Sequence, residues 1–414
     1  MTMQPTSRPG SILVVDDNRV SRMILTRALH EQGFQVTTAE HGQGALALLR
    51  SNGGPSFDVV LLDVLMPVMD GYQTLTEITH DPSLRHIPVI MISALDEMES
   101  AIRCIENGAT DYLPRPYNPA LLRARIGAGL ERKRLRDQEK IYLQALEREM
   151  LIGRQIQASF LPAQLPQLPG WEIAARFQAA RQVAGDFYDV FPLQSGASLG
   201  LVIGDVCDKG VGAALFMTLF RSLIRALAGF GEGMASPTTA EGRARQLTRT
   251  ILRTNTYITL NHAQANMFAT LFFAILDPAT GELTYVNAGH EPPLILNADG
   301  IKARLATSGV PVGLFSEVEY RAGVAQLEVG DILLGFSDGV IDAQDAAGER
   351  FGRERLRREI ANPPPSAQEL LDRIQAGLSL HVSGADPFDD ITMLAIRRIA
   401  RSPTAEALAP APNP

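Results

Sequence analysis

The sequence predicts two folded domains of different class, a doubly wound α/β domain followed by an α+β sandwich, joined by a helix. Apolar strand-like runs alternate with helical runs between residues 11 and 127, which is typical of a parallel sheet. A charge-rich stretch without proline follows, and beyond it strand-like runs recur between long helical runs. The chain has 414 residues, more than a single core usually accommodates. We therefore expect separate domains.

The first domain is predicted at residues 11–128, with five short strands that alternate with five helices. Its strands are ILVVDD, FQVTTAE, FDVVLLDV, IPVIMISA and DYLPRP. Doubly wound parallel sheets carry their sites at the carboxyl ends of the strands. Asp16 and Asp17 end the first strand, Asp63 ends the third and Ser93 ends the fourth. These side chains are thus candidates for one shared site.

Residues 129–161 are predicted to form a helical linker. Five apolar or aromatic residues occupy the a and d positions of one heptad register, although Glu139, Glu149 and Gly153 interrupt that seam: Leu135, Tyr142, Leu146, Ile156 and Phe160. This pattern favours a helix that pairs with a copy of itself and makes the protein a homodimer. The alternative is a solvated amphipathic spacer.

The second domain is predicted at residues 162–400, opening after LPAQLPQLPGW breaks the linker helix. Its strand-like runs are WEIAARF, LGLVIGDV, MFATLFFAIL, GELTYVNAG, DILLGFSDG and ITMLAIRRI, with a hairpin turn at DPATGE. Helices are expected at 211–229, 240–261, 353–361 and 366–381. Antiparallel strands with long helices indicate an α-β-β-α sandwich. Residues 401–414, rich in Ala and Pro, are expected to be disordered.

Charge and composition narrow the classes of partner. The formal net charge is −8, so no global basic field attracts nucleic acid, and no basic recognition helix is evident. Cys104 and Cys207 lie far apart and outside any CxxC spacing, which fits a reducing compartment better than a disulfide framework. The N-terminus has no apolar signal-like region, and no uncharged apolar stretch approaches membrane-spanning length. We expect a cytoplasmic protein without a membrane or nucleic-acid partner.

Four aspartates in the second half of the chain share one kind of setting. Asp186, Asp205, Asp338 and Asp389 each lie at or near the end of a strand-like run, most beside a glycine. Carboxylates gathered at strand ends without a His or Cys cluster suit hard cations such as Mg²⁺ or Mn²⁺, and zinc is not expected. Two such ions about 4 Å apart can hold a hydroxide for in-line attack on a phosphomonoester. A single aspartate of this kind is usually a cap or turn residue, but the set of four points to a metal site.

Residues 11–130 resemble the response-regulator receiver family through VVDD at 14–17, LLDVLMPVMDG at 61–71, SA at 93–94 and DYLPRP at 111–116. The resemblance implies that Asp63 accepts a phosphoryl group, that Asp16 and Asp17 bind Mg²⁺, and that Ser93 and Tyr112 are the switch residues. It also implies a sensor histidine kinase as partner.

Each receiver motif has a simpler interpretation when it is considered alone. Asp16 and Asp17 could cap a helix, and Asp63 could be a turn residue. Arg115 stands where the receiver family usually has Lys. Arginine can still bind phosphate as a fork, although it is not a compact point charge.

The region from about Met150 to Arg398 resembles the metal-dependent protein serine/threonine phosphatases, in their branch from sporulation and stress-response sigma-factor switches. The motifs are RQIQASFLP, VAGDFYDVF, GDVCDKGVGAALFM, NAGHEPPLIL, GVPVGL, FSDGVIDA and DDITMLAI. The resemblance implies that Asp186, Asp205, the carbonyl of Val206, Asp338 and Asp389 bind two Mg²⁺ or Mn²⁺ ions, with Asp205 bridging. Asp390 and His290 are additional candidates.

Three residues of these motifs have open roles. His290 is either a hydrogen-bonded structural histidine or a phosphate contact. Asp208 stands where some relatives have Gly. Cys207 is interpreted most simply as a small core-like residue, with a redox role as the alternative.

Together the two resemblances predict a response regulator whose phosphorylation at Asp63 controls a protein phosphatase. The implied substrate is a phosphorylated anti-anti-sigma protein, and activation is the expected direction of control. The alternative is an adaptor whose phosphatase-like domain binds a sigma factor or another partner without catalysis. Such a degenerate domain should have lost metal carboxylates, whereas this chain keeps all four.

Overall fold

The computed structural model describes residues 10–51, 56–93, 98–116, 118–193, 197–229 and 239–400. The tail for which disorder is expected, 401–414, lies outside the described residues. The chain forms two compact units, the first ending at Glu147 and the second beginning at Arg148.

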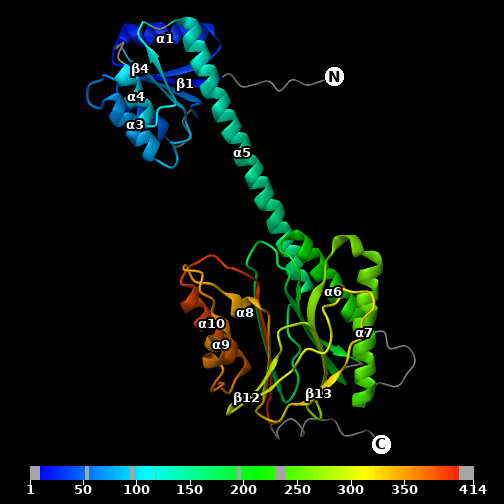
Figure 1. Ribbon diagram of the computed structural model, residues 1–414. Helices are drawn as coiled ribbons and strands as arrows, with labels where there is room; N and C mark the ends of the chain where they lie inside the picture. Colours follow the sequence, from blue (N-terminus) through cyan, green and yellow to red (C-terminus); the bar gives the residue numbers. More distant parts are fainter. Residues whose placement is uncertain are drawn as a thin grey trace, which may run out of the picture. The chain divides into compact units, whose positions relative to one another are not determined.

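The first unit contains a parallel sheet with strand order β2-β1-β3-β4-β5 (Figure 1). Its strands are β1 (Ser11–Val15), β2 (Gln35–Ala39), β3 (Val59–Asp63), β4 (Val89–Ser93) and β5 (Asp111–Pro114). The helices between them are α1 (Arg19–Glu31), α2 (Gly42–Leu49), α3 (Gly71–His80) and α4 (Met98–Glu106). This is the doubly wound fold that the alternating sequence pattern predicts.

Alternation along the strands supplies two apolar cores, one on each face of this sheet. Leu13 and Val15 point into the core shared with α2, α3 and α4, whereas Ile12 and Val14 point into the core shared with α1 and α5. A sheet covered on both faces needs strands that are apolar throughout, which explains the runs ILVV and VVLL. Helix α3 begins at a capping box in which Asp70 accepts from the Gln73 amide.

Helix α5 (Pro119–Phe160) is 42 residues long. It runs without interruption through residues 128 and 129, where the sequence analysis separates the first domain from the linker. Several a and d residues of the predicted seam have exposed side chains, with Leu135 57%, Tyr142 68%, Leu146 40% and Ile156 57% exposed. These exposed side chains are compatible with both expectations, a helix that pairs with a copy of itself and a solvated spacer.

The second unit contains two antiparallel five-stranded sheets. The first has the order β13-β10-β9-β8-β7, from β7 (Phe187–Leu193), β8 (Ser198–Val206), β9 (Ala269–Leu276), β10 (Glu282–Ala288) and β13 (Gly323–Gln326). The second has the order β12-β11-β14-β15-β6, from β6 (Trp171–Gln178), β11 (Leu294–Asn297), β12 (Gly300–Arg304), β14 (Ile332–Phe336) and β15 (Ile391–Arg398).

The two sheets pack face to face, and helices cover their outer faces (Figure 1). Helices α6 (Val211–Gly229) and α7 (Ala240–Asn261) cover the first sheet. Helices α8 (Gly339–Asp342), α9 (Gly352–Glu359) and α10 (Ala367–Val382) cover the second. Between the sheets lies a core to which Leu201, Phe272 and Ile396 contribute. The predicted α-β-β-α sandwich is therefore confirmed.

Helix α6 is the one helix among the described residues that is long and apolar in the manner of a membrane span, and its two arginines leave the expectation about uncharged apolar stretches unchanged. Its 19 residues are long and apolar enough to cross a membrane by length and composition, although it carries Arg221 and Arg225. Its buried residues, among them Met217 and Phe220, pack in the core of the second unit. A core helix of this kind passes the same test as a membrane span.

Candidate functional site

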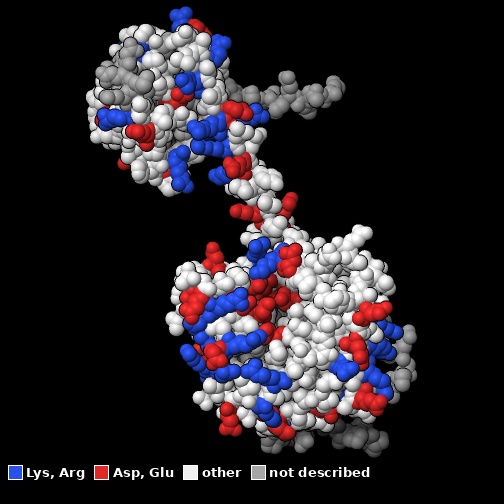
Figure 2. Space-filling model, viewed as in Figure 1, with Lys and Arg blue, Asp and Glu red and all other residues white. Residues whose placement is uncertain are grey.

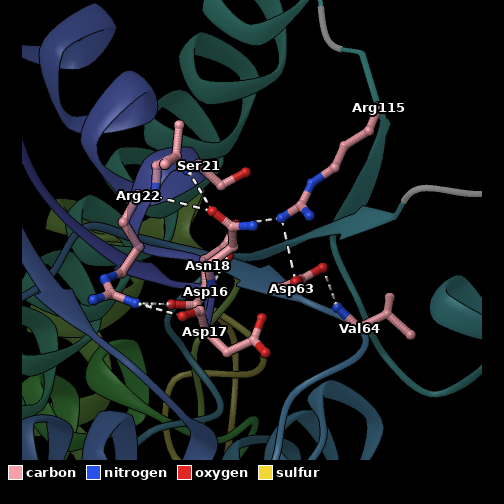
Figure 3. A network of polar contacts seen from close by, with 9 residues as sticks. Asp16, Asp17, Asn18, Ser21, Arg22, Asp63, Val64 and Arg115 are labelled. Atoms are coloured by element: carbon pink, nitrogen blue, oxygen red, sulfur yellow. Dashed lines mark hydrogen bonds and ion pairs between the residues drawn. The ribbon is translucent and has the colours of Figure 1, made fainter.

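Three carboxylates gather at the carboxyl edge of the first sheet. One oxygen from each of Asp16, Asp17 and Asp63 lies within 4.8 Å of the others, which is close enough for one cation. Asp16 and Asp63 are buried, and Asp17 is exposed (Figure 3). Asn18, rather than either aspartate, caps α1 by accepting from the Val20 and Ser21 amides. The capping alternative for Asp16 and Asp17 is therefore wrong.

Arg115 points into this cluster and lies between two of its members (Figure 3). Its guanidinium donates to Asp16 Oδ2, and the same nitrogen lies 3.2 Å from Asp63 Oδ2. Burial raises the pKa of Asp63 to about 6, against the opposing effect of Arg115, and Asp16 adds to the rise. The cluster thus carries more negative charge than one arginine offsets. Three oxygens at this spacing fit a hard cation such as Mg²⁺.

Of the two predicted switch residues, Ser93 lies beside this cluster and Tyr112 lies on β5. Ser93 ends β4 beside Asp63 at the end of β3, because the register pairs Asp63 with Ile92. The Ser93 side chain is buried, and its carbonyl accepts from the Arg115 amide at 2.7 Å. Tyr112 on β5 packs partly buried against the core under α2, α3 and α4. The neighbour of Ser93 in the SA motif, Ala94, lies outside the described residues.

In the second unit, four strand ends bring the predicted metal-binding aspartates to one edge of the sandwich. Asp186 precedes β7 and Asp205 lies near the end of β8, and these strands are antiparallel, with Phe187 opposite Gly204. Asp338 follows β14 and Asp389 precedes β15, which are antiparallel in the other sheet. Since one strand of each pair starts where the other ends, each sheet contributes two carboxylates.

Burial and mutual repulsion disfavour the ionised form of these carboxylates and raise their pKa values. Burial, then Asp205, raises the pKa of Asp186 well above its usual value. Burial, then Asp338, raises the pKa of Asp205 to about 7, and burial with Asp389 raises the pKa of Asp338. Asp186 Oδ2 is buried and has no hydrogen-bond partner among the described residues. Buried carboxylates that repel one another and leave an oxygen unpaired fit hard cations.

The spacing of this second set is looser than that of the first. Among the described residues, three acidic side chains reach within 4.8 Å of one another only at Asp16, Asp17 and Asp63. The aspartates of the sandwich are close enough to shift one another's pKa, yet no three of them converge on one point. Asp389 already pairs with a cation, since the Lys209 ammonium lies 2.9 Å from its Oδ2.

Asp390 and His290 lie behind this edge, and each makes hydrogen bonds within the protein. Asp390 Oδ1 accepts from the Ala180 amide at 2.7 Å, and Oδ2 accepts from the Gly185 amide at 2.8 Å. His290 is 2% exposed, and its Nδ1 lies 3.0 Å from the Thr270 hydroxyl. Burial lowers the pKa of His290 to about 4, which keeps the ring neutral. Both side chains are thus engaged inside the protein.

The loop after β8 explains one departure from the resemblance. Asp208 has a φ of 71°, in the left-handed region that glycine adopts without strain. A glycine at this position in some relatives is therefore accounted for by the backbone. The Sγ of Cys207 accepts from the Phe268 amide at 3.2 Å, so the thiol fills a structural position in this loop.

Sequence reasoning missed a direct link from α5 to the Asp186 loop. Gln157, near the end of α5, donates from Nε2 to the Ala184 carbonyl at 2.6 Å, and its Oε1 accepts from the Ala184 amide at 3.0 Å. The side chain is 6% exposed. A glutamine in the RQIQASFLP motif thus holds the backbone two residues before Asp186. Its only signal in the sequence is a polar residue inside a recognisable motif.

Asp189 was also missed, since its role depends on residues far along the chain. It is buried on β7 and pairs with Arg221 at 2.9 Å and Arg225 at 3.0 Å. Both arginines project from α6, the helix that follows the Asp205 loop. A buried carboxylate that pairs with two arginines has a structural role and is not available to bind a metal ion.

Comparisons with known proteins divide the chain in the same way. A family model described as stage II sporulation protein E matches residues 195–399, and one described as the response regulator receiver domain matches residues 12–127. Protein IcfG of Synechocystis sp. is 44% identical over 265 residues, which are 60% of this chain and 41% of that protein. The match therefore spans less than half of IcfG.

Two further proteins resemble the region that contains the sandwich. The phosphoserine phosphatase RsbU of Bacillus subtilis is 28% identical over 258 residues, covering 62% of this chain and 71% of that protein. The solved SiaA-PP2C domain of Pseudomonas aeruginosa has a TM-score of 0.51 and is 18% identical, over 62% of this chain and 98% of that one. The second likeness shows the fold alone.

Proposed function

Because the chain combines a response regulator receiver domain with a PP2C-type phosphatase domain of the SpoIIE family, we propose that phosphorylation of Asp63 controls a metal-dependent phosphoprotein phosphatase. The substrate would carry phosphoserine or phosphothreonine. RsbU, a relative, is named a phosphoserine phosphatase, which supports this class of substrate. An anti-anti-sigma protein is our specific proposal, with activation as the direction of control.

The observation that carries the proposal is the electrostatics of the Asp205 edge. Burial and neighbouring carboxylates raise the pKa of Asp205 to about 7, so the free protein leaves a place for positive charge there. Asp186, Asp205, the Val206 carbonyl, Asp338 and Asp389 would hold two Mg²⁺ or Mn²⁺ ions. Bound cations would offset the charge on the phosphoryl group and activate water for attack. Asp390 and His290 would position the loops behind them.

In the receiver domain, Asp16 and Asp17 would bind Mg²⁺ beside Asp63. Asp63 would attack the phosphodonor, and Arg115 would release Asp16 and contact the new phosphoryl group. Ser93 and Tyr112 would respond to it as switch residues. A sensor histidine kinase is the proposed donor, and the cytoplasm is the proposed location.

Phosphatase activity is tested with an aryl phosphate and a phosphoserine peptide in Mn²⁺. Asp205→Asn and Asp338→Asn should each lose activity and metal binding while circular dichroism stays unchanged, because each removes charge from a site for dications. Asp299→Asn, an exposed aspartate in the same unit, is the matched control. Wild-type protein that binds partners but hydrolyses neither substrate would instead be a non-catalytic adaptor.

The input step is tested separately with a small phosphodonor in Mg²⁺. Mass spectrometry of wild-type protein should show one added phosphoryl group, and Asp63→Asn should show none, because an amide is a poor nucleophile toward phosphorus. A phosphorylated Asp63→Asn variant would place the acceptor elsewhere.

A further inference from the structure

Beside the Asp338 edge of the sandwich lies a groove whose charge changes sign along its length. A pocket of about 400 Å³ is lined by Asp338 together with Glu291, Asp342, Arg350 and Arg353. A second pocket of about 290 Å³ shares Glu291 and Arg353 with the first. The two pockets are therefore neighbours that share the Glu291–Arg353 ion pair, and together they make a surface that begins at a proposed metal ligand. We call it the α9 groove.

The far half of the α9 groove is basic over an apolar floor. Arg304, Arg353 and Arg357 line it with a single acidic residue, Glu291. Apolar side chains also line this half: Leu294, Ile301, Phe336, Leu356 and Ile360. Figure 2 shows basic side chains gathered over the region of α9 and β12, next to a concentration of acidic ones. A local basic surface is notable on a chain whose net charge is −8.

The arginines of the groove are available to a partner. Arg304 is exposed and has no acidic partner among the described residues. Arg353 pairs with Glu291 at 2.8 Å, but its side chain remains 63% exposed. Arg357 pairs with Glu354, three residues away on α9, and that pair is also exposed. The exposed pair of Arg357 with Glu354 contributes little to stability, so an incoming carboxylate can replace Glu354 at little cost.

We propose that the α9 groove selects phosphoprotein substrates with acidic residues beside the phosphorylated residue. This inference rests on the proposed phosphatase activity and assigns its substrate class. The phosphoryl group would lie at the Asp338 end, and neighbouring Glu or Asp side chains would pair with Arg304, Arg353 and Arg357. Placing complementary charges along one groove fixes the direction of the bound segment.

Two synthetic peptides test the inference with the full chain in Mn²⁺. Both contain one phosphoserine, which is flanked on each side by Glu in the first and by Gln in the second. We expect the kcat/KM of wild-type protein to be about tenfold higher for the Glu peptide at low salt, and the preference to shrink at about 0.5 M salt, where charges are screened within a few ångströms. In Arg304→Gln/Arg357→Gln the preference should fall to about one.

A matched control removes the same charge elsewhere in the unit. Arg245 and Arg321 are exposed arginines with acidic partners outside the groove. Arg245→Gln/Arg321→Gln should keep the wild-type preference, and an equal loss in both double variants would overturn the inference. Equal hydrolysis of the two peptides by wild-type protein would overturn it as well, while the phosphatase proposal stood. If neither peptide were hydrolysed but the labelled Glu peptide bound preferentially by fluorescence anisotropy, the groove would stand and the phosphatase proposal would fail.

Discussion

At the scale of single residues, Asp205 links metal binding to pH. Its folded pKa of about 7 lies above the unfolded value of 3.8, so its contribution to stability is full below pH 3.8 and is lost as the pH rises through 7. Metal-free protein should therefore be less stable at pH 8 than at pH 5 through this residue. A bound cation replaces the proton and removes that loss.

The prediction is that Mn²⁺ raises the unfolding midpoint of the second unit more at pH 8 than at pH 5. The extra rise should be at least about 3 °C, the shift that about 1 kcal/mol produces in a domain of this size. Trp171, the sole tryptophan of the chain, is buried on β6 and reports this unit by fluorescence. Asp205→Asn should lose most of the difference. An equal rise at both pH values in wild-type protein would contradict the prediction.

Arg115 competes with the cation that its own cluster would bind. It occupies Asp16 and Asp63 in the free protein, so Arg115→Ala should tighten Mg²⁺ binding several-fold while lowering the yield of phosphorylated protein. Calorimetric titration and mass spectrometry measure the two effects. Arg27→Ala, which removes an exposed arginine from α1, should change neither. Weaker Mg²⁺ binding in Arg115→Ala would show that the guanidinium supports the site rather than competing for it.

At the scale of secondary-structure elements, the long helices and the strands of the receiver domain were predictable, whereas several strands of the sandwich were not. Helices α6 and α7 were predicted at 211–229 and 240–261, because their apolar periodicity extends over five turns or more. Strand β7 was not identified as a strand, since it contains Pro192 and buries the charged Asp189. Strands β12 and β13 lie at the edges of their sheets, are mostly exposed or half-buried and contain no apolar run, and β11 has only the three apolar residues of LILN.

Residues of the candidate site were likewise predictable only where a local sequence pattern marks them. The aspartates were found because a carboxylate beside glycine at a strand end is a local pattern. Gly339 illustrates the need for that glycine, since a Cβ there would lie 1.9 Å from the Asp390 carbonyl oxygen. Gln157, by contrast, bonds to Ala184, 27 residues further on. The arginines of the α9 groove come from β12 and the segment around α9, and no sequence pattern joins them.

Gln157 links α5 directly to the loop that precedes the proposed metal ligand Asp186. Gln157→Ala removes two buried hydrogen bonds to Ala184, each contributing about 1 kcal/mol, and frees the loop before Asp186. We expect the apparent Mn²⁺ affinity of phosphatase activity to fall about tenfold, which a metal titration measures. Gln155→Ala is the matched control, since Gln155 is an exposed glutamine on the same helix. Equal metal affinities in the two variants would leave Gln157 a purely structural role.

At the scale of the whole molecule, control requires that α5 carry a change from one unit to the other. We propose that two copies of α5 pair along Leu135, Tyr142, Leu146 and Ile156, whose side chains are exposed in a single copy. Replacing Leu146 and Ile156 by Gln should weaken dimers and uncouple phosphatase rate from the phosphorylation of Asp63, because apolar side chains at the a and d positions hold two paired helices together.

Light scattering and the phosphatase rate, with and without phosphorylation, test this coupling. Leu380→Gln, which changes another exposed leucine, is the control. The energy required is modest, since about 5.5 kcal/mol takes a two-state equilibrium from 1:99 to 99:1. A linker variant that stayed as responsive to phosphate as wild-type protein would exclude the helical seam as the transmission element.

Strand β15 sets when the second unit can become complete during synthesis. It pairs with β14 on one side and β6 on the other, so it lies inside its sheet although both partners precede it in the sequence. It also follows Asp389 directly. Until β15 leaves the ribosome, β6 and β14 have no shared neighbour and the fourth carboxylate is missing. A nascent chain therefore completes the receiver domain before it can assemble the proposed metal site, so the proposed output cannot act before the domain that is proposed to control it has been made.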